Sequence, residues 1–172
     1  LCLVGLAGCG DEASVPAMPP PAGAKIVNAW TAVTNEAAAK SAIRVDKTTP
    51  PVQFMAPGVV VMPADFTQDP PPARANWDIK LPCDLRLWPG IQFDFYCDDL
   101  AQFGSFSCYF RSGDGGYHGS FSPEENGVWQ RVTVSKSQCG IEGKPEGWGK
   151  ISMVRISGWR ANTGKARCAI AN

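Results

Sequence analysis

Polar and hydrophobic residues alternate along most of the chain after residue 24, in short runs separated by glycine, proline and polar turn residues. A period of two is typical of β-strands that bury one face and expose the other. In residues 90–99 the positions predicted to point inward are Ile91, Phe93, Phe95 and Cys97. In residues 104–111 the inward set is Phe106, Cys108 and Phe110, and the outward set is Ser105, Ser107, Tyr109 and Arg111.

The same alternation, with turns between the runs, predicts about ten short strands. They lie at residues 26–30, 41–46, 53–62 with a break at 57–58, 76–81, 90–99, 104–111, 117–121, 129–135, 151–159 and 167–171. Residues 112–116 are predicted to be a loop, and residues 34–40 are the only stretch with good helix chemistry. Residues 24–172 are therefore predicted to form one all-β domain, a sandwich of two antiparallel sheets.

Composition supports a folded β-domain and excludes several partners. The 18 Gly and 15 Pro residues are incompatible with an all-helical fold, and 44% hydrophobic residues suffice for a core. Lys plus Arg and Asp plus Glu both number 16. A net charge of zero lacks the basic excess that binding to nucleic acid or to an anionic membrane surface requires, so we expect neither interaction.

The N-terminal residues predict export. Residues 1–8 are an apolar run too short to span a bilayer, and we interpret them as the remnant of a signal peptide. Leu6-Ala7-Gly8-Cys9 resembles a bacterial lipoprotein signal, which implies that Cys9 carries lipid. Residues 9–23 then form a proline-rich tether. We expect lipid anchoring in the bacterial cell envelope, at the outer membrane or cell surface, in a chain that forms the N-terminal part of a longer protein.

Seven cysteines occur, and five remain after Cys2 and Cys9 are assigned to the signal and the lipid site. Cys97 and Cys108 are a candidate disulfide if their strands form a hairpin; alternatively all five are small buried residues. No Cys-x-x-Cys pair is present and His118 is the only histidine, so a zinc site is poorly supported.

Several sequence runs occur in an order that resembles a known family. They are residues 91–99 (IQFDFYCDD), 106–117 (FSCYFRSGDGGY), 127–137 (GVWQRVTVSKS), 142–148 (EGKPEGW) and 151–160 (ISMVRISGWR). This succession resembles the galactose-binding-like jelly-roll domains attached to bacterial glycoside hydrolases. The resemblance implies a jelly-roll sandwich that binds a polysaccharide or glycan or positions a downstream catalytic domain. It also implies a structural calcium ion as a candidate cofactor, with Asp98-Asp99 and Asp65/Asp69 as oxygen donors.

Catalysis by this chain is not expected. The Glu-x-Asp-x-x-Glu pattern of retaining jelly-roll glucanases is absent, although Asp94 and Asp98 share a strand face. No nucleophile elbow is present for a catalytic triad. A polysaccharide lyase is the main enzymatic alternative, because Arg111, Tyr117 and His118 lie close together around a glycine-rich turn.

Binding of a sugar requires aromatic faces and polar side chains, and the chain has six tryptophans. Trp77, Trp129 and Trp159 lie at strand ends, where core packing explains them. The predicted ligand surface consists of Arg111, Tyr117, Trp148 and Arg160, with Trp88, Asp98 and Asp99 as outlying candidates. The leading interpretation is a non-catalytic carbohydrate-binding module. The alternatives are a structural sandwich that packs on a downstream enzyme domain and a polysaccharide lyase.

Overall fold

A computed structural model describes residues 32–171. The predicted signal remnant, lipidated Cys9, tether and strand at 26–30 lie outside these residues, and those predictions remain untested. A short helix, α1 (Glu36–Ala42), begins the described part. Asn35 caps it, because the Asn35 side chain accepts a hydrogen bond from the Ala38 amide at 2.9 Å. No helix within residues 32–171 has the length and apolar character needed to cross a bilayer.

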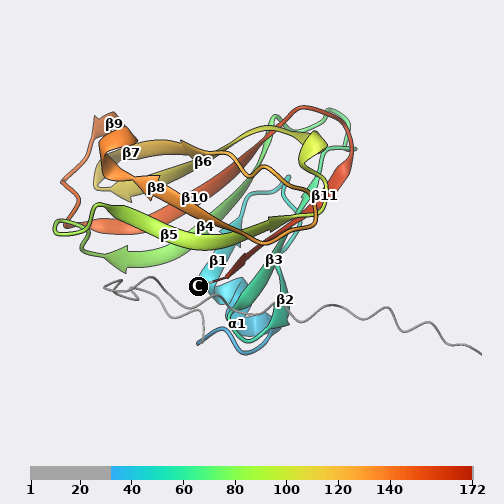
Figure 1. Cartoon of the computed structure of the whole chain (residues 1–172), viewed down its shortest axis with the longest axis horizontal. Coiled ribbons are helices and arrows are strands. Elements are labelled where there is room, and N and C mark those ends of the chain that lie inside the picture. The colour runs from blue at the N-terminus through green and yellow to red at the C-terminus, as the bar shows by residue number, and fades with distance from the viewer. Residues whose placement is uncertain (1–31, 172) are drawn as a thin grey trace, which may run out of the picture.

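Eleven strands follow and form two antiparallel sheets in two layers (Figure 1). The six-stranded sheet has the order β1-β4-β10-β6-β7-β9 and the five-stranded sheet the order β2-β3-β11-β5-β8. The strands are β1 (Ile43–Val45), β2 (Gln53–Ala56), β3 (Val59–Asp65), β4 (Arg74–Cys83), β5 (Gly90–Cys97), β6 (Phe103–Ser112), β7 (Asp114–Phe121), β8 (Gln130–Ser135), β9 (Gly140–Lys144), β10 (Ile151–Arg160) and β11 (Lys165–Ala171).

Phenylalanines from both sheets meet in the core between the layers. Phe93 and Phe95 of β5 come from the five-stranded sheet, whereas Phe106 of β6 and Phe121 of β7 come from the six-stranded sheet. The Phe95 ring centroid lies 5.0 Å from that of Phe106 and 5.2 Å from that of Phe121, in edge-to-face geometry. This packing follows from the predicted alternation, which places the phenylalanines of each strand on one face.

Two local predictions are wrong. Residues 112–116 are not a loop: Gly113, with φ of 58°, turns the chain tightly and β7 begins at Asp114. Strand β9 was not predicted, because its sequence has two glycines and one large apolar residue, Ile141, which is exposed. An edge strand with little buried surface leaves no alternating pattern to detect.

The predicted Cys97–Cys108 hairpin pair is also wrong. Strand β5 ends at Cys97, and the chain then passes through the short 3₁₀ turn Leu100–Gln102 into β6, which belongs to the other sheet. Both thiols are free and buried. Sequence adjacency of two strands suggested a hairpin, whereas the connection crosses between the layers.

Candidate functional site

Four polar or aromatic side chains form a row across the outer face of the six-stranded sheet. In the backbone register, Asp78 of β4 lies opposite Arg155 of β10. Arg155 in turn lies opposite Tyr109 of β6, which lies opposite His118 of β7. The residues immediately before and after each of the four are buried. Because successive residues of a strand point to opposite faces, the four side chains project outward.

The rings of Tyr109 and His118 lean across glycines of the neighbouring strands. A Cβ atom at Gly116 of β7 would lie 2.7 Å from Tyr109 Cζ, and it would also clash with the Phe110 carbonyl oxygen. A Cβ atom at Gly140 of β9 would lie 2.5 Å from His118 Cε1 and 2.8 Å from Nε2. The glycines therefore leave the space that both rings occupy, which lets the rings lie along the sheet surface.

Trp159, near the end of β10, adds a third ring to this outer face. Its side chain is 39% exposed, and indole Nε1 donates a hydrogen bond to Ser107 Oγ at 3.2 Å. The guanidinium carbon of Arg74 lies 4.7 Å from the ring centroid, a cation–π distance. These contacts orient an indole that still meets solvent. Our expectation that Trp159 fills the core is therefore wrong, whereas Trp77 is completely buried as expected.

Arg155 and Asp78 form a bidentate ion pair beside Tyr109. Arg155 Nε donates to Asp78 Oδ1 at 2.5 Å and Nη2 donates to Oδ2 at 2.9 Å. The pKa of Arg155 is raised, chiefly by its hydrogen bond to Asp78. Two parallel charge-assisted hydrogen bonds hold the guanidinium plane in one orientation. The pair thus presents fixed donors and acceptors at the β4 end of the row.

A chain of hydrogen bonds fixes the amide of Asn76 on the same strand as Asp78. Asn76 Nδ2 donates to Asp46 Oδ2 at 2.8 Å, and Asn76 Oδ1 accepts from Ser157 Oγ at 2.8 Å. Asp46 Oδ1 accepts further hydrogen bonds from Thr48 and Thr49. Burial raises the pKa of Asp46, but the hydrogen bonds from Asn76, Thr49 and Thr48 outweigh it and lower the pKa below its ordinary value.

The environment of Tyr109 favours the neutral phenol. Burial raises its pKa, and the charge of Glu142 raises it further. The charges of Arg111 and Arg155 act in the opposite direction without reversing the shift. A neutral phenol both donates and accepts a hydrogen bond, whereas a proton-abstracting tyrosine needs a lowered pKa.

Two of the seven predicted ligand residues lie on or beside this outer face. Arg111 is exposed and follows Tyr109 by two residues on β6, so it projects to the same side. Arg160 is exposed and follows Trp159 at the end of β10, where its Nε donates to the Pro72 carbonyl at 3.0 Å.

The predicted aromatic pair of the ligand surface points inward instead. Tyr117 lies opposite the buried Phe110, is only 8% exposed, and stacks on Trp148 with 3.9 Å between ring centroids. Trp148 and Trp88 are partly buried and pack against the core. The prediction that Tyr117 offers a ring to solvent is therefore wrong. The turn-like sequence around Trp148 suggested exposure, but the turn folds its indole onto β7.

The same finding removes the predicted lyase arrangement. Tyr117 points into the sandwich, whereas its neighbour His118 is on the outer face with Arg111. Adjacent residues of a strand face opposite ways, so these three groups do not surround one cleft.

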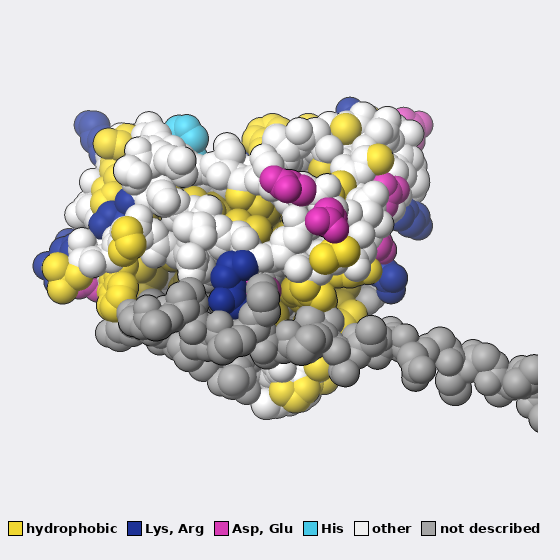
Figure 2. Space-filling view, viewed as in Figure 1, with side chains coloured by type: hydrophobic (Ala, Val, Ile, Leu, Met, Phe, Trp, Pro, Cys, Tyr) yellow, Lys and Arg dark blue, Asp and Glu magenta, His cyan; other side chains and the backbone are white. Residues whose placement is uncertain are grey.

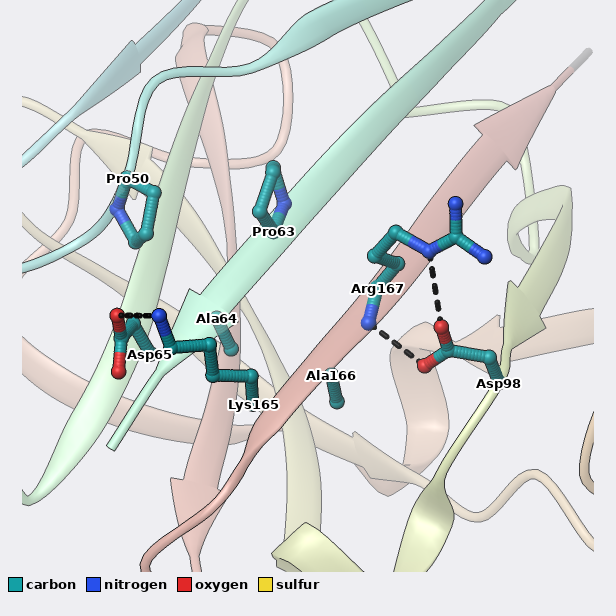
Figure 3. A pocket seen from close by; sticks show the side chains of 8 residues that line it. All are labelled: Pro50, Pro63, Ala64, Asp65, Asp98, Lys165, Ala166 and Arg167. Atoms are coloured by element: carbon teal, nitrogen blue, oxygen red, sulfur yellow. Dashed lines mark hydrogen bonds and ion pairs between the residues drawn. The ribbon is translucent and has the colours of Figure 1, made fainter. Parts of the chain in front are cut away.

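Three of the four predicted calcium donors, Asp65, Asp98 and Asp99, are engaged by other groups. Figure 3 shows Asp98 and Asp65 at separate positions around a pocket of about 430 Å³, each directed at its own cation. Asp98 Oδ2 lies 3.0 Å from Arg167 Nε, and Asp65 Oδ2 lies 3.1 Å from Lys165 Nζ. Asp99 caps the Leu100–Gln102 turn by accepting from the Ala101 amide.

Within residues 32–171, no group of three or more His, Cys, Asp or Glu side chains could hold a metal ion. Calcium needs six to eight oxygen ligands around one point. Asp65, Asp98 and Asp99 do not gather around one point in this way, and a structural calcium ion stays a prediction.

The sequence pattern did not predict the row of Asp78, Arg155, Tyr109 and His118 as a whole, although it placed one member, Tyr109, on the correct face. The alternation in β6 placed Tyr109 outward with Ser107 and Arg111, as the structure does. The pattern did not predict the neighbours of Tyr109 on other strands. Arg155, Asp78 and His118 lie beside it because of the order and register of the strands in the sheet. The order of strands in a sheet is not written in local periodicity.

Charged groups of both signs are spread over the molecule without a dominant patch on the visible face (Figure 2). Acidic and basic side chains are both seen there, interspersed with apolar and uncharged polar surface. This view agrees with the zero net charge of the sequence. This face therefore lacks a large electrostatic field of one sign that would attract an oppositely charged partner.

No protein-family model matches the chain, and no curated protein matches it in sequence. Among solved structures, an agarase, AgWH50C, is similar with a TM-score of 0.53 and 10% identity, over 76% of this chain and 22% of the agarase. The family 11 carbohydrate-binding module of the Clostridium thermocellum cellulosomal cellulase Lic26A-Cel5E has a TM-score of 0.43 and 13% identity, over 76% of this chain and 79% of the module.

A third structure, from work on promiscuous carbohydrate-binding modules of the β-sandwich superfamily, has a TM-score of 0.42 and 9% identity, over 76% of this chain and 55% of its own. This chain thus spans about a fifth of the agarase with which it shares a fold. At such low identity the similarity shows the fold alone. The predicted antiparallel β-sandwich is confirmed, and part of the agarase shares this fold.

Proposed function

We propose that this chain is a non-catalytic carbohydrate-binding module whose ligand lies on the outer face of the six-stranded sheet. The observation that carries the proposal is the set of three rings on that face, Tyr109, His118 and Trp159. Two of these rings lie over glycines and the third is oriented by Ser107 and Arg74. Sugar rings have apolar C–H faces that stack on such surfaces.

Polar groups beside the rings suit the hydroxyls of a sugar. The Arg155–Asp78 pair and the exposed Arg111 offer donors and acceptors next to Tyr109. Because the ion pair is already formed, little side-chain entropy is lost on binding. A sugar hydroxyl both donates and accepts, as do these groups together.

The chemistry of this outer face supports binding more than turnover. Tyr109 has a raised pKa and stays a neutral phenol at neutral pH, which suits hydrogen bonding to a hydroxyl. Asp78 is held in an ion pair, whereas a glycosidase needs one carboxyl as acid and another as base or nucleophile.

We further propose the setting of the module. The Leu6–Cys9 sequence supports lipid anchoring of an exported bacterial protein at Cys9. The fold shared with part of an agarase supports a role beside a catalytic domain that acts on a polysaccharide. Incorporation of labelled palmitate into the wild type, and its loss in Cys9→Ala, tests the anchoring separately from sugar binding.

Affinity gel electrophoresis in agarose, xylan, mixed-linkage β-glucan and alginate tests the binding. We expect at least one polysaccharide to retard the wild-type protein and the combined Tyr109→Ala and Trp159→Ala variant to migrate freely. Tyr117→Phe, a change in the interior, is the matched control and should be retarded like the wild type. Equal mobility of all proteins in every gel would leave the purely structural sandwich as the better account.

A further inference from the structure

Two buried cysteines face each other across neighbouring strands of the five-stranded sheet. Cys97, the last residue of β5, lies directly opposite Cys168 of β11. Both side chains have 0% exposure. Opposed residues of an antiparallel pair project to the same side of the sheet, so the two thiols share one space in the core.

The backbone bonding around the pair brings the two residues close together. The Asp98 amide donates to the Arg167 carbonyl at 3.1 Å. This inter-strand hydrogen bond therefore joins the residues next to the cysteines and not the cysteines themselves. The Cys97 carbonyl accepts instead from the Gly127 amide at 2.7 Å. The cysteines therefore occupy a non-hydrogen-bonded position, where opposed Cα atoms are about 4.5 Å apart. This separation lies within the range that a disulfide spans.

The pair is distinct from the other thiols that the structure describes. Of the five free cysteines in residues 32–171, only Cys97 and Cys168 occupy opposed positions of two strands. Cys108 lies opposite Ile156 and Gly119, and Cys83 lies opposite Ile151. Burial raises the pKa of Cys168, and the hydrogen bond that its thiol donates to Cys97 is the next cause of the rise.

We infer that Cys97 and Cys168 are joined by a disulfide when the chain folds in an oxidising medium. The two thiols lose two protons and two electrons, and an S–S bond forms. A small disulfide such as oxidised glutathione takes up the electrons and protons and is reduced to two thiols. Because the folded sheet shields both sulfurs and disfavours the thiolate, the bond forms before the sheet closes.

This bond would tie the C-terminal strand β11 to β5 at the centre of the five-stranded sheet. It would also close a long loop of the unfolded chain. In the entropic account of disulfide stability, the conformational freedom that the unfolded chain loses in this way supplies most of the stabilisation. We expect the melting temperature of the oxidised protein to exceed that of the reduced protein by roughly 10 °C.

The test is refolding of denatured, reduced protein in a glutathione redox buffer, followed by alkylation, digestion and mass spectrometry. We expect a cross-linked peptide that contains Cys97 and Cys168, two hydrogens lighter than the sum of its parts. Cys83→Ser is the matched control and should keep the cross-link, and Cys168→Ser should lose it. Full alkylation of Cys97 and Cys168 in oxidised wild-type protein, or linkage of either to another cysteine, would overturn the inference.

Discussion

Tyr109 and His118 occupy directly opposed positions on β6 and β7, and each ring covers a glycine of the next strand, Gly116 and Gly140 respectively. The rings are thus stepped across the sheet in one direction, from β6 towards the edge strand β9. A bulky side chain at either glycine would take the place of the ring. The glycines are therefore part of the proposed binding surface, although they offer no side chain of their own.

Gly140→Ala tests this relationship. The three atoms nearest to the added methyl group all belong to the His118 imidazole, which can rotate away, so we expect the fold to survive and the ring to leave the surface. Affinity for the retained polysaccharide should fall about fivefold, or about 1 kcal/mol. Affinity electrophoresis measures the change and thermal unfolding checks the fold.

Gly104→Ala is the matched control for that substitution. Gly104 is also in a strand of the six-stranded sheet, but a Cβ atom there meets only Ala161 Cβ at 3.8 Å, an ordinary contact. We expect wild-type affinity. An equal loss of affinity in Gly104→Ala and Gly140→Ala would show that the His118 ring is not responsible.

Trp159→Ala removes the largest ring of the proposed surface. We expect affinity to fall about tenfold, about 1.4 kcal/mol, with a change of unfolding free energy below about 1 kcal/mol, because the indole is only partly buried. Isothermal titration calorimetry and urea unfolding measure the two quantities. A large loss of stability with unchanged affinity would instead make Trp159 a packing residue.

Trp148→Ala should show the opposite behaviour. The Trp148 indole stacks on the ring of Tyr117 and lies 5.3 Å from that of Phe110, centroid to centroid. Its removal leaves a gap against the core, and we expect the unfolding free energy to fall by about 2–3 kcal/mol. Polysaccharide affinity, measured well below the melting temperature, should be unchanged. Reduced affinity in a variant that remains folded would return Trp148 to the ligand surface.

Asp46→Asn tests the network that holds Asn76. The folded-state pKa of Asp46 is below its ordinary value of 3.8, so its stabilising effect is complete above that pH and is lost as pH falls through the folded pKa. We expect the variant to be about 1 kcal/mol less stable at pH 7. The difference from wild type should shrink below pH 3.8. A difference that stays constant down to pH 2 would contradict the assignment.

Local periodicity was enough to predict the sandwich and the outward side of β6, because alternation is a property of each strand alone. It could not predict that Cys97 faces Cys168 and not Cys108, since that depends on which sheet β6 joins. Tyr117 was misplaced for a related reason. Its strand begins three residues earlier than predicted, and only the pairing with Phe110 shows that its ring is inward.

The most direct measurement of ligand position is an amide chemical-shift titration of the isotope-labelled protein with an oligosaccharide from the polysaccharide that retards it. We predict that the shifted amides lie on β6, β7 and β10, around Tyr109, His118 and Trp159. Shifts confined to the five-stranded sheet, or to the region of Tyr117 and Trp148, would contradict binding on the outer face of the six-stranded sheet.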